Sequence, residues 1–265
     1  MTEDGNAELG LRPLTARSVL LSTLLGLDPP VLPAARLVAT AGLFGIAEGT
    51  ARVALSRMVR AGEVEADGAR YRLTGRLLER QARQASGLRP RPRRWRGGWH
   101  LAVVTATGRS AAERAALRQT LIGARFAEWR EGVWLRPDDL PRPDVAGVDW
   151  ATARPDEPPL HLWDLDGHAA RAIGLRAHLQ RTPPDIDDLA TGFVVSAAVL
   201  RHLAADPPLP PALLPDPWPN DALRDVYATW DRDYRALLAR WHRSSGSHAS
   251  ATPTTSSAAI GGDHR

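Results

Sequence analysis

The stretch AEGTARVALSRMVRAGEVEADGARYRL, residues 47–73, decides the fold of the first part of the chain. Its first half predicts a helix over residues 47–61. Its second half predicts two short strands around Asp67 and Gly68, a dipeptide typical of tight β-hairpins. The strands cover residues 63–66 and 70–73. The stretch therefore presents a helix followed at once by a hairpin.

Two more helices are predicted upstream of this stretch. The first runs from its N-cap Thr15 to Leu25, and Gly26 ends it. The second is shorter, because Pro33 opens it and Gly42 stops it. Three helices followed by a hairpin predict a winged helix-turn-helix domain.

We place this winged helix at residues 15–86, after a flexible N-terminus at residues 1–14. A fourth helix, capped by Thr74, is expected to close the domain. A linker rich in Pro, Gly and Arg follows at residues 87–98. The arginines of residues 89–94 belong either to a stiff solvated spacer or to an arm that grips phosphate.

On a helical wheel, residues 47–61 have one apolar and one polar face. Ala51, Leu55 and Met58 lie on the apolar face, which is suited to packing. The polar face is basic, and a helix of this kind fits the major groove of DNA. The predicted DNA-binding residues, including one beside the hairpin tip, are Thr50, Arg52, Val53, Ser56, Arg57, Arg60 and Arg70.

These residues are expected to differ in role. Arg52, Ser56 and Arg57 are the predicted base readers, and Val53 could touch a thymine methyl group. Arg60 is expected to contact phosphate, which carries no sequence information. Arg70 is expected to reach the minor groove or the backbone. The alternative is a solvated helix face with a wing that contacts protein.

Positive charge is concentrated in the first part of the chain. All 34 basic residues are arginine, and residues 17–96 hold 15 of them against six acidic residues. Residues 97–265 hold 18 arginines against 21 acidic residues. A one-sided surplus of this size suggests a polyanionic partner such as a nucleic acid or an acidic membrane surface.

Composition excludes several classes of protein. A chain of 265 residues with 43% hydrophobic and 24% charged residues is typical of a globular protein with a buried core. Because there is no cysteine, disulfides, thiolate metal sites and cysteine nucleophiles are excluded. No apolar run reaches the roughly 18 residues that span a bilayer, and the acidic first ten residues are unlike a secretory signal. We expect a cytoplasmic protein with no membrane partner.

A second domain is predicted at residues 99–166. Its order is strand, helix, strand, strand, a weak element and a last strand, which fits a ferredoxin-like fold. The helix begins with a capping box formed by Ser110 and Glu113. The strands are predicted at residues 99–104, 126–130, 133–136 and 161–165.

The rest of the chain is predicted to be a helical C-terminal domain, residues 167–243, followed by a disordered tail at residues 244–265. A proline-rich loop at residues 206–219 is too rigid to be a mere tether. The helices are expected at residues 167–179, 187–204 and 220–241. The fold class is therefore α+β, with a winged helix-turn-helix, a ferredoxin-like middle domain and an α-helical C-terminal domain.

Several runs of this sequence, in this order, resemble the PaaX family of bacterial transcriptional repressors, which is named for control of phenylacetate catabolism. The resemblance covers nearly all of residues 15–243. The runs are ARSVLLSTLLG (16–26), LFGI (43–46), TARVALSRMVRAGEVE (50–65), YRLTGRLLERQ (71–81), REGVWLRPDDL (130–140), WDL (163–165) and DPPLPPALLPDPWP (206–219).

The resemblance implies a homodimeric repressor on a double-stranded DNA operator of a catabolic operon. It also implies release from DNA by an aromatic acyl-coenzyme A such as phenylacetyl-coenzyme A. We expect the middle and C-terminal regions to hold the dimer. The alternative is a non-catalytic nucleic-acid-binding or scaffold module without a small-molecule effector.

The sequence departs from the family pattern in two places. The family often has serine where this chain has Ala47, so the predicted recognition helix lacks its usual N-cap. The second helix of the ferredoxin-like domain is hard to find between Leu140 and Leu160.

An effector of this kind needs an apolar pocket for its acyl end and arginine for its phosphates. All nine tryptophans lie after residue 94, and residues 97–265 hold 18 arginines. The C-terminal two thirds therefore supply both apolar rings and basic groups. The predicted effector-binding residues are Trp129, Arg130, Trp134, Arg136, Trp163, Arg171 and Trp230. A tryptophan buried in a core is the commoner meaning of each.

No enzyme activity, metal or cofactor is expected. The family's middle domain is similar to a CRISPR-associated nuclease with a metal-binding aspartate after its first strand. Here the corresponding strand is followed by no carboxylate before Glu113. Ser196 and His202 have no nucleophile elbow around them. Possible metal ligands also lie at short spacing in His161, Asp164, Asp166 and His168. On a strand, side chains 161 and 164 point to opposite faces, so a clustered metal site would need a bend in the chain.

Overall fold

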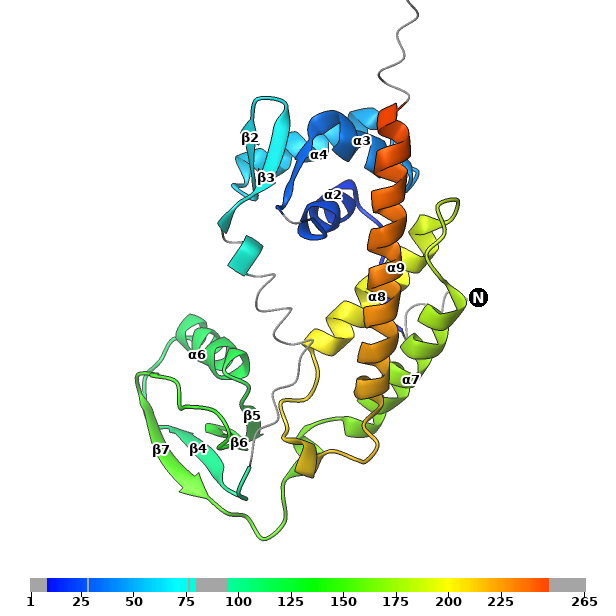
Figure 1. Cartoon of the computed structure of the whole chain (residues 1–265). Helices are drawn as coiled ribbons and strands as arrows, with labels where there is room; N and C mark the ends of the chain where they lie inside the picture. The colour runs from blue at the N-terminus through cyan, green and yellow to red at the C-terminus, as the bar shows by residue number, and fades with distance from the viewer. Residues whose placement is uncertain (1–8, 28, 76, 80–94, 248–265) are drawn as a thin grey trace, which may run out of the picture.

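The computed structural model describes residues 9–27, 29–75, 77–79 and 95–247. Figure 1 shows an N-terminal lobe of helices with a small sheet, a separate lobe built on a larger sheet, and long C-terminal helices that run between them. The predicted α+β class and the order of the three regions are confirmed.

The N-terminal lobe contains the three predicted helices, α2 (Ala16–Leu25), α3 (Ala34–Gly42) and α4 (Glu48–Arg60). The predicted hairpin is also present, as β2 (Val64–Asp67) and β3 (Arg70–Leu73), with Gly68 at a φ of +57° in the turn. Such a φ favours glycine, which has no Cβ to clash with the backbone. Leu20, Leu37 and Met58 lie in the core of this lobe.

The sequence did not predict a third strand, β1 (Val31–Pro33), which pairs antiparallel with β3. The sheet order is β1-β3-β2. Pro33 therefore ends a strand and stands at the N-cap of α3, instead of opening the helix. Three residues are too short for a strand pattern, and their pairing with residues 70–72 is fixed by the tertiary fold.

Of the predicted fourth helix, Gly75 and residues 77–79 are helical. The remainder of that helix and the arginines of residues 89–94 lie outside the described residues.

The middle lobe holds a four-stranded sheet with one helix on it. Its elements are β4 (Trp99–Val104), α6 (Ala111–Gly123), β5 (Ala127–Arg130), β6 (Val133–Pro137) and β7 (Val148–Ala153). The strand order is β5-β6-β4-β7, and every pairing is antiparallel. This is the strand order of a ferredoxin-like sheet. The predicted capping box is confirmed, because Ser110 and Glu113 each accept a hydrogen bond from the other's backbone N–H.

The predicted last strand at residues 161–165 is wrong. The last strand is β7, and residues 160–162 form a 3-10 turn, η1 (Leu160–Leu162), directly before the next helix. The alternation of apolar residues there was read as a strand. Leu160, Leu162 and Trp163 instead pack on the sheet as a short turn, while Asp164 caps the following helix.

No helix is present in residues 138–147, which join β6 to β7. Arg136 holds this irregular segment, because its guanidinium donates to the carbonyl oxygen of Leu140 at 2.9 Å. A nitrogen of the His100 ring lies 3.0 Å from the same oxygen. Two polar side chains of the sheet thus meet at one backbone carbonyl oxygen that a helix would have paired internally.

The proline-rich loop covers the sheet face opposite α6. Leu209 and Leu213, the second from the short helix η2 (Pro211–Leu213), join Trp99 and Leu135 in one buried cluster. The loop is therefore part of a core, as its predicted rigidity suggested.

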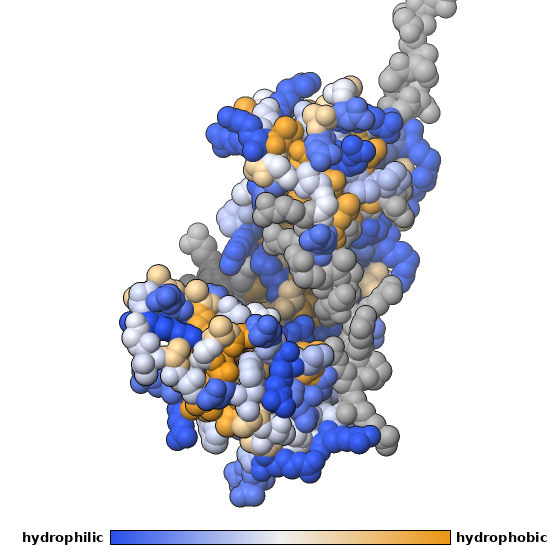
Figure 2. All heavy atoms as spheres, turned by 90° about the vertical axis from the view of Figure 1, so that its left-hand side faces the viewer, coloured by the Kyte–Doolittle hydropathy of each residue, from blue (hydrophilic) through white to orange (hydrophobic). Residues whose placement is uncertain are grey.

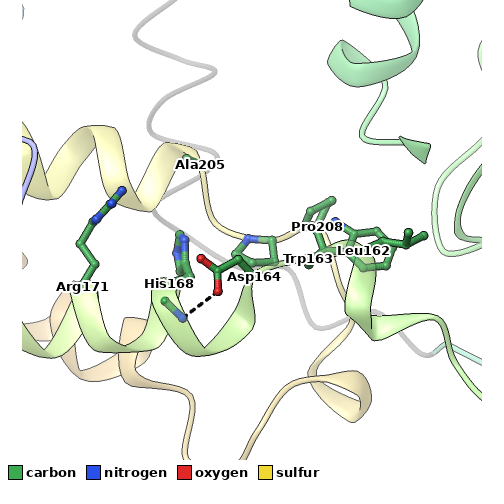
Figure 3. A pocket seen from close by; sticks show the side chains of 9 residues that line it. Leu162, Trp163, Asp164, His168, Arg171, Ala205 and Pro208 are labelled. Atoms are coloured by element: carbon green, nitrogen blue, oxygen red, sulfur yellow. Dashed lines mark hydrogen bonds between the residues drawn. The ribbon is translucent and has the colours of Figure 1, made fainter. Parts of the chain in front are cut away.

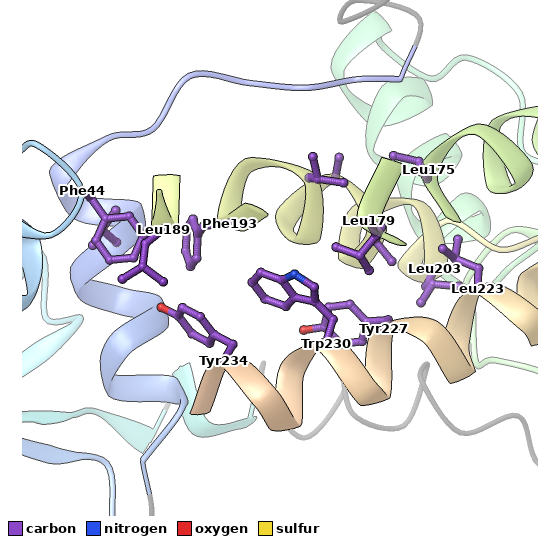
Figure 4. Packing of buried hydrophobic residues seen from close by; sticks show 14 of the residues in the cluster. Phe44, Leu175, Leu179, Leu189, Phe193, Leu203, Leu223, Tyr227, Trp230 and Tyr234 are labelled. Carbon is purple, nitrogen blue, oxygen red and sulfur yellow. The ribbon is translucent and has the colours of Figure 1, made fainter. Parts of the chain in front are cut away.

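The predicted C-terminal helices are confirmed as α7 (Leu165–Arg181), α8 (Leu189–Ala204) and α9 (Pro219–Ser247), of which α7 and α9 are longer than predicted and α8 begins two residues later. Figure 4 shows their shared core, in which the Trp230 and Tyr234 rings of α9 stack with centroids 5.1 Å apart. Phe44, from the N-terminal lobe, meets Phe193 of α8 edge-on at 5.2 Å. The C-terminal core therefore reaches into the N-terminal lobe.

Hydrogen bonds also tie α9 to the N-terminal lobe. Arg235 donates to the carbonyl oxygen of Gly26 at 2.8 Å, and Arg36 of α3 donates to that of His242 at 2.8 Å. The cluster that holds the C-terminal helices also includes Val19 and Phe44 of the N-terminal lobe, so it crosses a predicted domain boundary. The domain boundaries stay predictions. Helix α9 includes the first residues of the predicted tail, and residues 248–265 lie outside the described residues.

Among the described helices, none is both long enough and apolar enough to span a bilayer. On the face that Figure 2 shows, hydrophilic residues cover much of both lobes, with smaller hydrophobic patches between them.

Candidate DNA interface and ligand pocket

Helix α4 presents the polar face that the sequence predicts. Ala51, Leu55 and Met58 are buried against the rest of the lobe. All seven predicted DNA-binding residues are exposed, six on α4 and Arg70 at the start of β3. Val53 is 50% exposed, which is unusual for a large apolar side chain and leaves it open to contact a partner.

The polar side chains of α4 differ in how far they are already engaged. Arg52 pairs with Glu48 one turn earlier, at 2.7 Å. Ser56 donates its hydroxyl to the carbonyl oxygen of Arg52 at 3.1 Å, and Arg60 donates to that of Ser56 at 3.4 Å. The guanidinium of Arg57 has no hydrogen bond or ion pair within the described part of the chain. Arg57 is therefore the predicted base reader that is free without rearrangement.

A shallow groove of about 840 Å³ separates α4 from the start of α2. Thr50, Val53 and Arg57 line its α4 side. On the other side, Arg17 is held by Glu63, to which its Nε donates at 2.9 Å. Three of the predicted DNA-binding residues thus share one concave surface.

The N-cap of α4 is Ala47, and no side chain caps this end of the helix. We expect Ala47→Ser to raise the free energy of unfolding by about 1 kcal/mol, because a serine hydroxyl can accept from a free N–H of the first turn. Ala47 is exposed and its backbone is extended, so serine fits. Urea unfolding would measure the gain. Ala47→Val, which has no acceptor, is the control, and an equal gain in that variant would contradict the capping argument.

The predicted effector-binding residues do not all come together. Trp134, Arg136 and Trp230 are buried, and each is engaged in a core. Arg136 donates to the carbonyl oxygen of Ala124 at 3.0 Å, and Trp230 donates to that of Thr182 at 2.8 Å. All three side chains therefore contribute to packing, and their role in effector binding stays a prediction.

Trp129 and Arg130 lie on edge strand β5. The Trp129 side chain is 45% exposed, and the Arg130 guanidinium lies 5.8 Å from its ring centroid. Of the seven predicted residues, Trp163 and Arg171 line one pocket together.

This pocket lies at the start of α7 and has a volume of about 340 Å³ (Figure 3). Figure 3 shows His168 and Arg171 rising from α7 towards Ala205 at the end of α8, with Leu162 and Trp163 at the other end. Its lining residues are Leu162, Trp163, Asp164, Gly167, His168, Arg171, Ala205, Pro207 and Pro208.

A hydrogen-bonded network lies behind His168. Asn220, fully buried in the first turn of α9, donates through Nδ2 to Asp206 at 2.6 Å and to Nε2 of His168 at 2.9 Å. Because a carboxylate oxygen accepts, the amide nitrogen must face Asp206, so Nε2 of His168 is the acceptor. The neutral ring of His168 therefore carries its proton on Nδ1. The Asn220 oxygen then accepts from Nε2 of His202, at 2.9 Å.

His168 and His202 also stack, with ring centroids 3.8 Å apart. No local sequence pattern predicts this pair, because His202 lies on α8 and His168 on α7. The Asp164 carboxylate caps the start of α7, where it accepts from the Gly167 N–H at 2.9 Å. Residues 9–27, 29–75, 77–79 and 95–247 contain no group of three His, Asp or Glu placed to hold a metal.

Both histidines are held neutral. Burial, followed by the nearby His202 and Arg171 charges, lowers the pKa of His168 to about 4, although Asp206 acts in the opposite direction. Burial is also the largest cause that lowers the pKa of His202. The folded protein therefore binds fewer protons than the unfolded chain below the ordinary histidine pKa of about 6.5.

We expect the free energy of unfolding to be highest above pH 6.5 and to fall as the pH drops towards 4. Between pH 6.5 and pH 4 these histidines bind protons in the unfolded state, whereas His168 and His202 stay neutral in the folded state because burial lowers their pKa. Urea midpoints at pH 7 and pH 5 would measure the loss before most carboxylates titrate. His168→Gln should show a smaller loss than wild type. A wild-type midpoint that does not move between these pH values would contradict the expectation.

Comparison with known proteins extends these observations. The family model described as PaaX-like protein matches residues 15–77, and the model for the PaaX protein central Cas2-like domain matches residues 92–147. Among solved structures, the chain is similar to the uncharacterized protein Rv0674 from Mycobacterium tuberculosis. The two share 43% identity over 88% of this chain and 99% of that chain, with a TM-score of 0.73. No curated protein matches the chain.

Proposed function

This chain belongs to the PaaX-like family, which implies a transcriptional regulator, and from that premise we propose that it is a homodimeric DNA-binding repressor of a catabolic operon. The observation that carries the proposal is the exposed basic face of α4, supported by a buried apolar face in a winged-helix lobe. Such a helix fits the major groove of DNA.

The charge distribution supports the same partner. The N-terminal region carries the arginine surplus of the chain, and attraction to phosphate supplies much of the affinity of DNA-binding proteins. Because the described residues hold a single winged-helix lobe, we propose that two copies match two half-sites of an operator by two-fold symmetry. Sedimentation of the full-length chain at several concentrations tests the dimer, and a monomer throughout would contradict it.

We further propose that an aromatic acyl-coenzyme A, such as phenylacetyl-coenzyme A, is the effector that releases the operator. A ligand that binds the DNA-incompetent arrangement more tightly shifts the population away from DNA, and by reciprocity DNA weakens ligand binding. We assign the chain no catalytic step.

A footprint on the DNA upstream of its own gene tests the whole proposal. The full-length protein should protect a two-fold symmetric site, and phenylacetyl-coenzyme A should reduce the protection. No protected site at low salt would contradict DNA binding. Protection that no aromatic acyl-coenzyme A reduces would favour the alternative, a nucleic-acid-binding or scaffold module without a small-molecule effector.

A further inference from the structure

The pocket at the start of α7 has a mostly polar lining, with a smaller apolar part formed by ring side chains. Trp163 offers an indole ring, and Pro207 and Pro208 offer two pyrrolidine rings, all lining the same cavity. Flat rings of this kind accept a planar aromatic group, because aromatic groups pack best against surfaces they can cover. The apolar part of the pocket therefore suits an aryl ring.

The donors come from α7. The Nδ1–H of His168 has no acceptor within the described residues, because the network behind the ring uses Nε2. Arg171, one turn further along α7, is exposed, and its guanidinium has neither a hydrogen bond nor an ion pair in the described structure. A neutral imidazole donor suits a carbonyl oxygen, and a guanidinium suits a carboxylate or phosphate.

Acidic groups at the pocket are already engaged. Asp164 also lines the cavity, and its carboxylate accepts from the Gly167 N–H. Asp206, behind His168, accepts from Trp218 at 3.1 Å and from Asn220. These hydrogen bonds hold the two carboxylates in place and leave Arg171 as the charged group open to a ligand.

We infer that this pocket binds the aryl-acyl end of the effector, with the ring against Trp163 and the prolines, the thioester carbonyl oxygen at His168 and the nearest amide oxygen of the pantetheine arm at Arg171. This inference rests on the proposed effector class and adds the site. The volume of about 340 Å³ is near the lower end of the range for ligand pockets, so the nucleotide end of an acyl-coenzyme A stays outside.

Binding of phenylacetyl-coenzyme A to the full-length protein, followed by calorimetry, tests the site with two variants. Ala205→Phe places a ring in the mouth of the pocket without removing a polar contact, and Ala205 is exposed. Ala204→Phe adds the same ring to the neighbouring exposed residue outside the lining and is its control. We expect Ala205→Phe to weaken binding at least tenfold and Ala204→Phe to leave it within twofold.

Arg171→Ala should weaken phenylacetyl-coenzyme A about tenfold, because a hydrogen bond to a charged group is lost. Its control is Arg181→Ala, an exposed arginine about 15 Å further along α7. Phenylacetate should compete with the probe, whereas coenzyme A alone should not. We expect phenylacetyl-coenzyme A to change the tryptophan emission of the wild type saturably. In Trp163→Phe this change should be largely lost, although the variant still binds.

The outcomes separate the two claims. If wild type binds the probe and both pocket variants bind it as tightly, this site is wrong and the effector class stands. If wild type protects its operator but binds no aromatic acyl-coenzyme A, the effector class and this site fall together. Unchanged operator binding by each variant shows that it folds. If coenzyme A alone competes and phenylacetate does not, the pocket does not hold the aryl end.

Discussion

Asp206→Ala is expected to lower the free energy of unfolding by about 3 kcal/mol. The carboxylate accepts hydrogen bonds from Trp218, Asn220 and Arg224, all at the start of α9. The Arg224 side chain is only 12% exposed, so the variant would leave a largely buried guanidinium without its main partner. Removing one member of a buried pair typically costs about 3 to 5 kcal/mol, and the remaining Asp221 contact of Arg224 offsets part of this.

Urea unfolding at pH 7 would measure the loss. Glu65→Ala is the control, because Glu65 and its partner Arg72 both have side chains more than half exposed, at 61% and 53%. Such surface pairs contribute less than about 1 kcal/mol. A loss for Asp206→Ala no larger than that of the control would show that the network does not hold α9 in place.

The Arg52→Ala/Arg57→Ala double variant is expected to bind its operator roughly a hundredfold more weakly, with little change on unrelated DNA. Each arginine that donates to a guanine edge contributes about 1 to 3 kcal/mol of discrimination. The Glu48 pair of Arg52 does not prevent this contact, because both side chains are more than half exposed and the pair is weak. Competition between operator and unrelated duplexes in a gel-shift assay would measure the ratio.

Arg60→Ala is the matched comparison on the same helix. It should weaken operator and unrelated DNA alike, and lower the salt dependence of binding by about one phosphate contact. Equal operator binding by wild type and the double variant would end the assignment of α4 as the recognition helix.

Local signals predicted most of the fold correctly. Thr15 caps α2, Ser110 and Glu113 form a capping box on α6, and the turn at Gly68 closes the predicted hairpin. Each of these features depends on residues that lie within a few positions of one another. Such features can be read from sequence because their hydrogen bonds are local.

The errors arose where distant residues decide the structure. Strand β1 exists because Val31 to Pro33 meet β3, and β7 exists because residues 148–153 meet β4 along its whole length. The apolar alternation at residues 161–165 comes from a short turn that packs on the sheet. This alternation resembles that of a strand. The contacts that decide β1, β7 and the turn at residues 160–162 join residues far apart in the chain, so local sequence patterns do not predict these elements.

The candidate site divides in the same way. The exposed face of α4 follows from helical periodicity, so the sequence predicted it residue by residue. The pocket depends on the meeting of η1, α7 and the end of α8, so the sequence predicted Trp163 and Arg171 only by residue type. His168 and His202 were missed as a pair, because their contact joins two helices.

The length of α9 has a mechanical consequence. Asn220, in its first turn, touches the ring of His168, and His242, about 33 Å along the helix axis, accepts from Arg36 of the winged helix. A helix is a stiff lever over this distance, so a tilt of about 5° at Asn220 would displace the far end by about 3 Å. That displacement is close to the spacing of about 3.4 Å between successive bases of one DNA strand. A small tilt of α9 at the pocket, which breaks no part of the fold, would therefore move α3 by about the distance between two bases, because Arg36 of α3 is hydrogen-bonded to the far end of α9.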